Sequence, residues 1–209
     1  MKTLAIISRK GGAGKTTIAL HLAVAAEEKG IATAIFDLDP QASAAIWSDH
    51  RGKPIPAVLP AQSPRLSALL SQAKEQKADL VILDTAPHAD GIASDAANYA
   101  DLILIPCRPS ALDLDAIGAS IRLARTTEKP SVVIINAAPS QGTETAEAIE
   151  AIQKAGVEVC SIVLHQRKSY ASRIHEGKTA TEIEPKGKAA EETRALLLWV
   201  CDRLSLLLN

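Results

Sequence analysis

Residues 9–17 read R-K-G-G-A-G-K-T-T, and this stretch decides the fold of the 209-residue chain. A short apolar run at residues 4–7 precedes it, and an apolar-periodic segment at residues 18–26 follows it. Strand, tight Gly-rich turn and helix in this order are the context of a phosphate-binding loop. We therefore expect a helix that begins near Lys15.

The residue types in this loop suit a bound nucleotide. Gly11, Gly12 and Gly14 carry no Cβ, so the backbone can fold around a phosphate and aim its N–H groups inward. The helix N-terminus adds a partial positive charge. We expect Lys15 to reach the β- and γ-phosphates of ATP and the Thr16 hydroxyl to ligate Mg²⁺. The alternative is a Gly-rich turn that binds no ligand. The predicted nucleotide-binding residues of the loop are Lys10, Gly11, Gly12, Ala13, Gly14, Lys15, Thr16 and Thr17.

The loop departs from the general pattern in two places. It has Arg9 where that pattern has glycine, and it carries a second lysine, Lys10, just before the glycines. This arrangement resembles the deviant Walker A motif, K-G-G-x-G-K-T, of the ParA/MinD family of partition and positioning ATPases. The resemblance implies an ATP-sandwich homodimer in which Lys15 acts in cis, whereas Lys10 contacts the phosphates bound to the other subunit. Position alone also allows Lys10 to be a solvated lysine at the loop edge.

Two carboxylates follow the next predicted strand. Residues 32–36 are apolar, and residues 37–41 read D-L-D-P-Q. Carboxylates just past a strand lie where open α/β sheets place ligand chemistry. The string is similar to the switch I region of the same family. That similarity implies that Asp39 orients the attacking water and that Asp37 lies near the metal. An Asp-rich turn that caps the next helix is the alternative.

A third carboxylate ends another apolar run. Residues 80–87 read L-V-I-L-D-T-A-P, a Walker B pattern in which a buried strand delivers one carboxylate toward Mg²⁺. The string also resembles the entry to switch II of the family, which implies that Asp84 belongs to the metal shell. We expect residues 88–91 to form a mobile loop that senses the γ-phosphate.

An amide side chain ends the strand predicted at residues 131–135. Asn136 can pair with both a donor and an acceptor on a base edge, so we predict a contact with adenine. A turn-initiating asparagine is the alternative.

The alternation of apolar runs with helical periodicity predicts the overall architecture. A βαβ series gives a mostly parallel, twisted sheet with helices on both faces, which is the three-layer α/β fold of P-loop NTPases. We expect one ATPase domain over residues 1–209. Strands are predicted at residues 3–8, 32–36, 80–83, 102–106, 131–135 and 157–164, with a short one at 57–59. Helices are predicted at about 15–29, 41–50, 65–77, 112–125, 143–155 and 188–208.

Composition limits the classes of partner. The chain is 47% hydrophobic with a net charge of −1, so any nucleic-acid contact must come from a local patch. Its three cysteines show no metal or cluster spacing, as in a reduced cytosolic protein. Neither a signal peptide nor an apolar run of membrane-spanning length is visible. The chain is therefore predicted to be cytoplasmic, and its last helix to dock on the core and not on a membrane.

A basic segment lies near the C-terminus. Residues 165–178 hold four Lys/Arg and one acid. The stretch looks like the C-terminal segment of small plasmid-type ParA proteins, which implies sequence-independent DNA contacts through Arg167, Lys168 and Arg173. A solvated charged helix face is the alternative.

Together these motifs predict an ATP-dependent dimerisation switch. It would bind non-specific DNA on the nucleoid and partition or position plasmid or chromosomal DNA. The family implies slow hydrolysis until a ParB-like, centromere- or cargo-bound activator completes the site. One alternative is the same switch positioning a non-DNA cargo or protein complex. Another is a P-loop ligase or synthetase acting on a small metabolite. Electron transfer through a shared cluster is disfavoured, because no cysteine follows the switch motifs at a suitable position.

Overall fold

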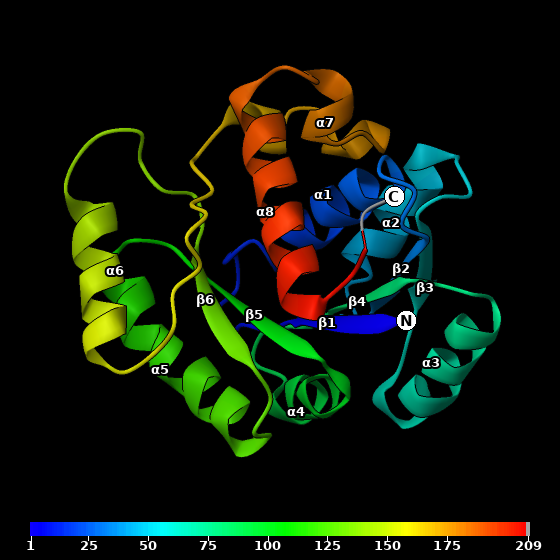
Figure 1. Cartoon of the computed structure of the whole chain (residues 1–209), viewed down its shortest axis with the longest axis horizontal. Coiled ribbons are helices and arrows are strands. Elements are labelled where there is room, and N and C mark those ends of the chain that lie inside the picture. Colours follow the sequence, from blue (N-terminus) through cyan, green and yellow to red (C-terminus); the bar gives the residue numbers. More distant parts are fainter. Residues whose placement is uncertain (208–209) are drawn as a thin grey trace.

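Six parallel strands form one sheet at the centre of the molecule (Figure 1). The structure is a computed structural model and describes residues 1–207. The strand order is β3-β2-β4-β1-β5-β6, and every pairing between these strands is parallel. The strands are β1 (Lys2–Ile6), β2 (Thr33–Asp37), β3 (Ala57–Pro60), β4 (Leu80–Asp84), β5 (Leu102–Cys107) and β6 (Ser131–Ile135).

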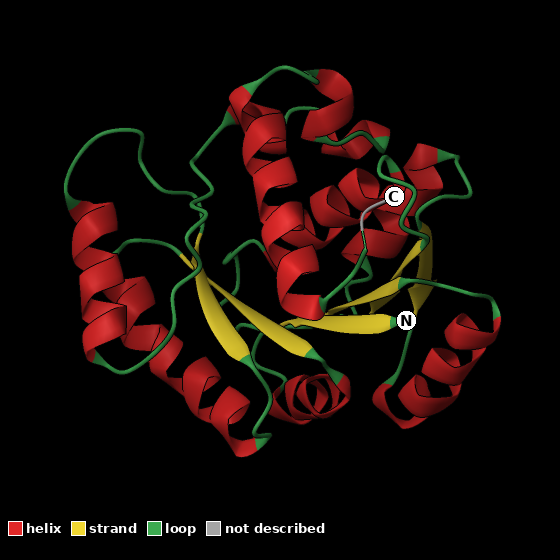
Figure 2. Cartoon of the chain, viewed as in Figure 1, coloured by secondary structure: helices red, strands yellow, loops and turns green. Residues whose placement is uncertain are grey.

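Helices cover both faces of this sheet (Figure 2). The α-helices are α1 (Lys15–Glu27), α2 (Ser43–Arg51), α3 (Leu66–Glu75), α4 (Asp90–Tyr99), α5 (Ala111–Thr126), α6 (Glu144–Lys154), α7 (Ala180–Ile183) and α8 (Lys188–Leu204). Three short 3₁₀ helices are η1 (Ser63–Arg65), η2 (Lys168–Tyr170) and η3 (Ile174–Glu176). Helices α1, α2 and α8 pack on one face, and α3 to α6 pack on the other. The predicted three-layer α/β fold is confirmed.

Five of the strands are largely apolar because both of their faces are buried; the exception is β3, which is mostly exposed. Successive side chains of a strand point to opposite faces of the sheet. Leu4 and Ile6 of β1 accordingly join the core under α1 and α8, whereas Ala5 and the following Ile7 join the core under α4 and α5. Two hydrophobic cores of similar extent therefore hold β1, and with it the start of the Gly-rich loop, in the middle of the sheet.

The strand predicted at residues 157–164 is wrong. Two isolated bridges, Val133 with Val159 and Ala138 with His165, stand in place of a continuous strand pairing with β6. Between the bridges, the N–H of Ile162 points to the sulfur of Cys160 at 3.4 Å and not to β6. The hydrogen-bond ladder is interrupted there, so the segment covers the outer edge of β6 without continuing the sheet.

Two helix predictions also need correction. A helix, α4, occupies Asp90–Tyr99, where a mobile loop was predicted at residues 88–91. Its buried face consists of alanines, which carry little hydrophobic signal in the sequence. The last helix ends at Leu204 and not near residue 208, because Ser205 takes a left-handed conformation with φ 52°. Position 208 lies outside the described residues. Over residues 1–207, no helix is long and apolar enough to cross a lipid bilayer.

Candidate active site

The Gly-rich loop joins β1 to α1 at the carboxyl edge of the sheet. Gly12 and Gly14 have φ angles of 73° and 97°, in the left-handed region that favours glycine. Gly14 is the residue before the first turn of α1, so the free N–H groups of that turn point into the loop. A Cβ at Gly14 would overlap the amide nitrogen of Asn136, which lies against the loop. The loop thus has the backbone that a phosphate cradle requires.

Lys15, the first residue of α1, is nearly buried. Its relative exposure is 6%, and burial lowers the pKa of its ammonium group, while the charges of Asp84 and Asp39 oppose that shift. A buried ammonium is costly unless anions compensate for its lost hydration. The loop N–H groups and Lys15 therefore provide a concentrated positive site for phosphate oxygens.

Asp84 is a buried carboxylate whose surroundings fit a cation. The residue has 0% exposure, and neither carboxylate oxygen has a hydrogen-bond partner among the described residues. Burial raises the pKa of Asp84 to about 7. The nearby Thr16 hydroxyl opposes that rise, but it is not positioned to donate a hydrogen bond to the Asp84 carboxylate. The residues fit Mg²⁺, because that ion uses one or two protein oxygens and completes its shell with water and phosphate. Within residues 1–207 no cluster of three His, Cys, Asp or Glu side chains offers an all-protein metal site.

Replacing Asp84 by Asn is expected to stabilise the ligand-free protein at pH 8 by about 2–4 kcal/mol. The folded-state pKa of about 7 lies above the ordinary aspartate value of 3.8. The folded state therefore holds its proton more tightly, and the wild type loses stability as pH rises from about 4 through 7. The neutral amide has no such loss. Urea unfolding of both proteins at about pH 5 and about pH 8 should show a gap that widens at the higher pH.

The same variant should lose the stabilisation that Mg²⁺ with ATP gives to the wild type. A Thr33→Ser protein, altered in the same sheet but away from the loop, should keep that stabilisation. An Asp84→Asn protein that is less stable than the wild type in alkaline buffer without ligand would contradict the buried, unpaired carboxylate.

Asp37 and Asp39 have different surroundings. The buried Asp37 carboxylate accepts backbone N–H groups from Asp39 at 3.1 Å, Ala44 at 2.9 Å and Ala45 at 3.1 Å. It therefore fixes the start of α2 to the end of β2. Asp39 is partly exposed, and its carboxylate accepts one N–H, from Gln41 at 2.9 Å. The metal role predicted for Asp37 and the water-orienting role predicted for Asp39 stay predictions.

Lys10 forms an ion pair within its own chain. Its ammonium lies 2.7 Å from the carboxylate of Asp113, which also accepts a 2.5 Å hydrogen bond from the Ser110 hydroxyl. Asp113 is buried, whereas the Lys10 side chain keeps 35% exposure. A contact of Lys10 with another subunit would require it to leave Asp113. No local motif pairs Asp113 with the loop, so sequence reasoning missed this contact.

A cavity of about 520 Å³ opens beside the loop. Asn136 lies in its wall and donates from its side-chain amide to the carbonyl of Ala13 at 2.7 Å, which leaves its amide oxygen uncommitted. A volume of this size suits a small-molecule ligand such as a nucleotide. The lining comes from Gly12 and Gly14, from α1, from the ends of β5 and β6, from residues 164–171 and from α8. Sequence reasoning missed the contributions of His21, Tyr170 and Thr193, because no local motif marks them.

Glu192 of α8 organises one wall of this cavity. Its carboxylate accepts hydrogen bonds from the His165 N–H at 3.1 Å, the Arg167 guanidinium at 2.6 Å and the Tyr170 hydroxyl at 3.3 Å. The Arg167 side chain keeps only 23% exposure and lines the cavity. The structure therefore separates the three residues predicted to bind DNA. Lys168 and Arg173 are exposed, but Arg167 is engaged in the cavity wall, and the DNA contacts stay predictions.

Comparisons with known proteins agree with this geometry. The model of the CobQ/CobB/MinD/ParA nucleotide binding domain matches residues 4–180. The maintenance of carboxysome distribution protein A of Halothiobacillus neapolitanus is 28% identical over an alignment of 207 positions, which covers 93% of this chain and 94% of that protein. Protein ParA of Rhizobium radiobacter is 28% identical over an alignment of 219 positions, which covers 98% of each chain. The structure of an ATP complex of a Cyanothece McdA variant has a TM-score of 0.75 at 19% identity, covering 99% of this chain and 97% of that one.

Proposed function

The chain belongs to the CobQ/CobB/MinD/ParA nucleotide-binding family, and from this premise we propose that it is an ATP-dependent dimerisation switch that binds non-specific DNA. The observation that carries the proposal is the buried Asp84 carboxylate, which has no hydrogen-bond partner among the described residues and lies near Lys15 and the Gly-rich loop. A P-loop with a single unpartnered carboxylate suits ATP and Mg²⁺, which bring the missing phosphate oxygens and positive charge.

In the proposed reaction the chain supplies position and charge. The loop N–H groups and Lys15 hold the β- and γ-phosphates, while Thr16 and Asp84 hold Mg²⁺, which when bound neutralises charge on the phosphate oxygens. Asp39 orients the attacking water. Lys10 leaves Asp113 and reaches the phosphates in the partner subunit. The dimer closes when ATP binds and opens after hydrolysis.

We also propose that turnover is slow without a partner. Arg9, at the start of the loop, is ion-paired with Asp90 at 2.9 Å, and Arg108 lies in the cavity wall. Neither has the free, fixed guanidinium that speeds phosphoryl transfer in related chemistry. We therefore propose a ParB-like activator, bound to a centromere or another cargo, that completes the site, and an association with the nucleoid.

ATP should be required for binding to non-specific duplex DNA, and this binding should fall steeply with salt. If about six or more phosphates are contacted, affinity drops by about 10³-fold or more between about 50 and 200 mM salt. Lys15→Ala should abolish the ATP-dependent binding, and Lys10→Ala should abolish it by preventing dimer closure. Fluorescence anisotropy over a salt series, with ATP, ADP and no nucleotide, measures this.

Lys154→Ala is the matched control, because Lys154 is an exposed lysine at the end of α6, away from the loop, and should leave the binding unchanged. DNA binding that does not depend on the nucleotide, or no DNA binding at any salt concentration, would contradict the proposal that the chain binds DNA.

The same switch positioning a protein assembly is the second candidate. The match to a carboxysome distribution protein extends over 93% of this chain. It favours the positioning of a protein assembly as much as the match to ParA favours DNA partition. Pull-down with the products of neighbouring genes, with and without ATP, distinguishes the two cargoes.

A further inference from the structure

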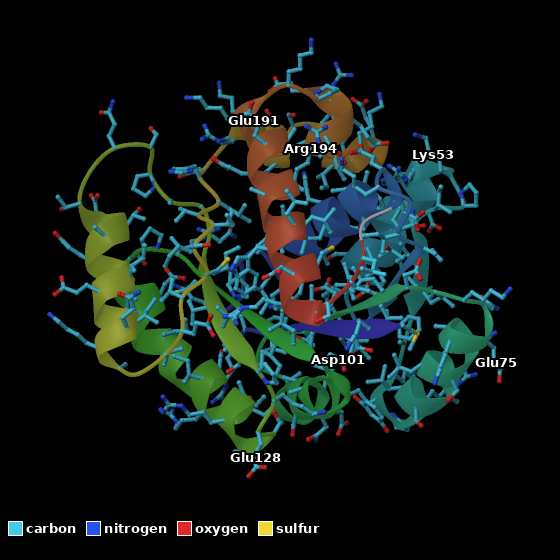
Figure 3. The ribbon with its side chains drawn as sticks, viewed as in Figure 1. Lys53, Glu75, Asp101, Glu128, Glu191 and Arg194 are labelled. Carbon is cyan, nitrogen blue, oxygen red and sulfur yellow. The ribbon has the colours of Figure 1, made fainter. Side chains whose placement is uncertain are left out.

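Three cations from distant parts of the chain surround one hollow on the surface. Lys53 follows α2, Arg173 precedes η3, and Lys178 follows η3, and together with Glu182 and Ile183 they line a hollow of about 370 Å³. Their side chains are 59%, 53% and 47% exposed. Figure 3 shows Lys53 at the margin of the molecule, on the side where Figure 1 places α7.

Positive charge exceeds negative charge around this hollow. Four cations share two carboxylates, in the ion pairs Arg51–Glu182 at 2.8 Å, Lys53–Glu182 at 3.2 Å, Arg173–Glu176 at 3.7 Å and Lys178–Glu176 at 3.1 Å. The net charge of the whole chain is −1, so this excess is local. A local excess of exposed, long-chain cations suits the phosphates of a polyanion.

Arg51 neutralises Glu182 from the buried side. Its guanidinium makes two hydrogen bonds to that carboxylate, at 2.8 and 3.0 Å, and a third to the carbonyl of Gly177 at 2.8 Å. Burial would raise the pKa of Glu182, but the hydrogen bonds from Arg51 and its neighbours outweigh burial and lower it to about 2. Because Arg51 already satisfies Glu182, the exposed Lys53 can exchange this carboxylate for a phosphate at small cost.

Helix α2 connects this hollow to the nucleotide site. Its first N–H groups are held by Asp37, next to Asp39, and its last residue, Arg51, is held by Glu182. Gly177 packs so closely that a Cβ there would overlap the backbone of Arg51. A helix of nine residues is about 13 Å long, and its two ends are held by Asp37 and Glu182, so it links the Asp37–Asp39 turn to the hollow.

We propose that Lys53, Arg173 and Lys178 form a binding surface for the phosphate backbone of duplex DNA, whose position is tied to the nucleotide site by α2. This inference rests on the proposed ATP-dependent DNA binding. Among the residues predicted to contact DNA, it leaves out Arg167 and adds Lys53 and Lys178. The surface reads no sequence, because all three groups contact phosphates and none reads a base.

Charge reversal at Lys53 tests the surface. Lys53→Glu and Lys178→Glu should each weaken ATP-dependent DNA binding about tenfold or more at about 100 mM salt, and should reduce the salt slope by about one. Lys53→Gln, which keeps most of the length and removes the charge, should show a smaller loss. Lys154→Glu makes the same change in net charge at a lysine of α6 with 73% exposure and should stay within about twofold. Lys154→Glu should also hydrolyse ATP at the wild-type basal rate without DNA.

The outcomes separate this surface from the proposed function. If the wild type binds DNA with ATP and Lys53→Glu binds equally well, or if Lys154→Glu loses as much as Lys53→Glu, this surface is wrong and the switch stands. If the wild type does not bind DNA with ATP, both the proposed function and this DNA-binding surface are wrong. ATP-dependent binding to phosphatidylglycerol vesicles but not to DNA, lost in Lys53→Glu, would overturn the DNA assignment in favour of a membrane.

Discussion

An Asp39→Ala protein is expected to bind ATP and dimerise but to hydrolyse ATP at least about 100-fold more slowly than the wild type. Asp39 lies past the end of β2, partly exposed, and only one of its carboxylate oxygens accepts a hydrogen bond, from the N–H of Gln41. The other oxygen has no hydrogen-bond partner among the described residues, and the proposed role of Asp39 is to orient a water toward the γ-phosphate. Phosphate release measures the rate, and size-exclusion chromatography with ATP should show the dimer accumulating.

Two other aspartates serve as controls for this variant. Asp49→Ala removes an exposed carboxylate of α2 and should leave hydrolysis unchanged. Asp37→Ala removes the acceptor for the first N–H groups of α2 and should lower stability by about 1–2 kcal/mol, as loss of a helix cap does. Rapid hydrolysis by Asp39→Ala would overturn the water-orienting role, whatever happens to the dimer.

Gly14→Ala is expected to abolish ATP binding and to destabilise the ligand-free protein by about 2 kcal/mol or more. Two independent penalties combine at this position. The φ angle of 97° is one that residues with a Cβ rarely adopt, and the added Cβ would overlap the side-chain nitrogen of Asn136. Relief of either strain moves the loop, and with it the N–H groups that face the phosphates. Urea unfolding and isothermal titration with ATP measure the two effects.

Gly11→Ala is the matched control within the same loop. A Cβ at Gly11 meets nothing within 4 Å, and its φ is outside the left-handed region, so ligand-free stability should change by less than about 0.5 kcal/mol. Adding Asn136→Ala to Gly14→Ala should remove the overlap but keep the φ strain, and should recover only part of the stability. Wild-type stability and ATP affinity in Gly14→Ala would refute both penalties.

Much of the fold was predictable because buried parallel strands are continuous apolar runs. Residues 131–135 were predicted as a strand with the bounds that β6 has, and the Gly-rich loop marked the strand and helix on either side of it. The strand predicted at residues 157–164 failed although it is also largely apolar. An apolar composition says that a segment is buried, but a strand also needs an uninterrupted ladder with its neighbour.

The candidate site divides in the same way. Sequence alone located the loop of residues 9–17 and the carboxylates Asp37, Asp39 and Asp84, because each follows or ends a strand and parallel strands end at one edge. That Asp84 lacks a protein donor was not readable, because it depends on which groups approach a buried carboxylate from other elements.

Only the tertiary structure determined the contacts between groups that are far apart in the chain. The pairing of Lys10 with Asp113, the engagement of Arg167 by Glu192 and the meeting of Lys53 with the C-terminal cations are examples. A charged side chain has long reach and no preferred partner in sequence, so its role depends on which opposite charge the fold brings near. Local motifs therefore determined where phosphate chemistry belongs in this protein, and packing of helices α2, α5 and α8 determined which cations are free to take part in binding.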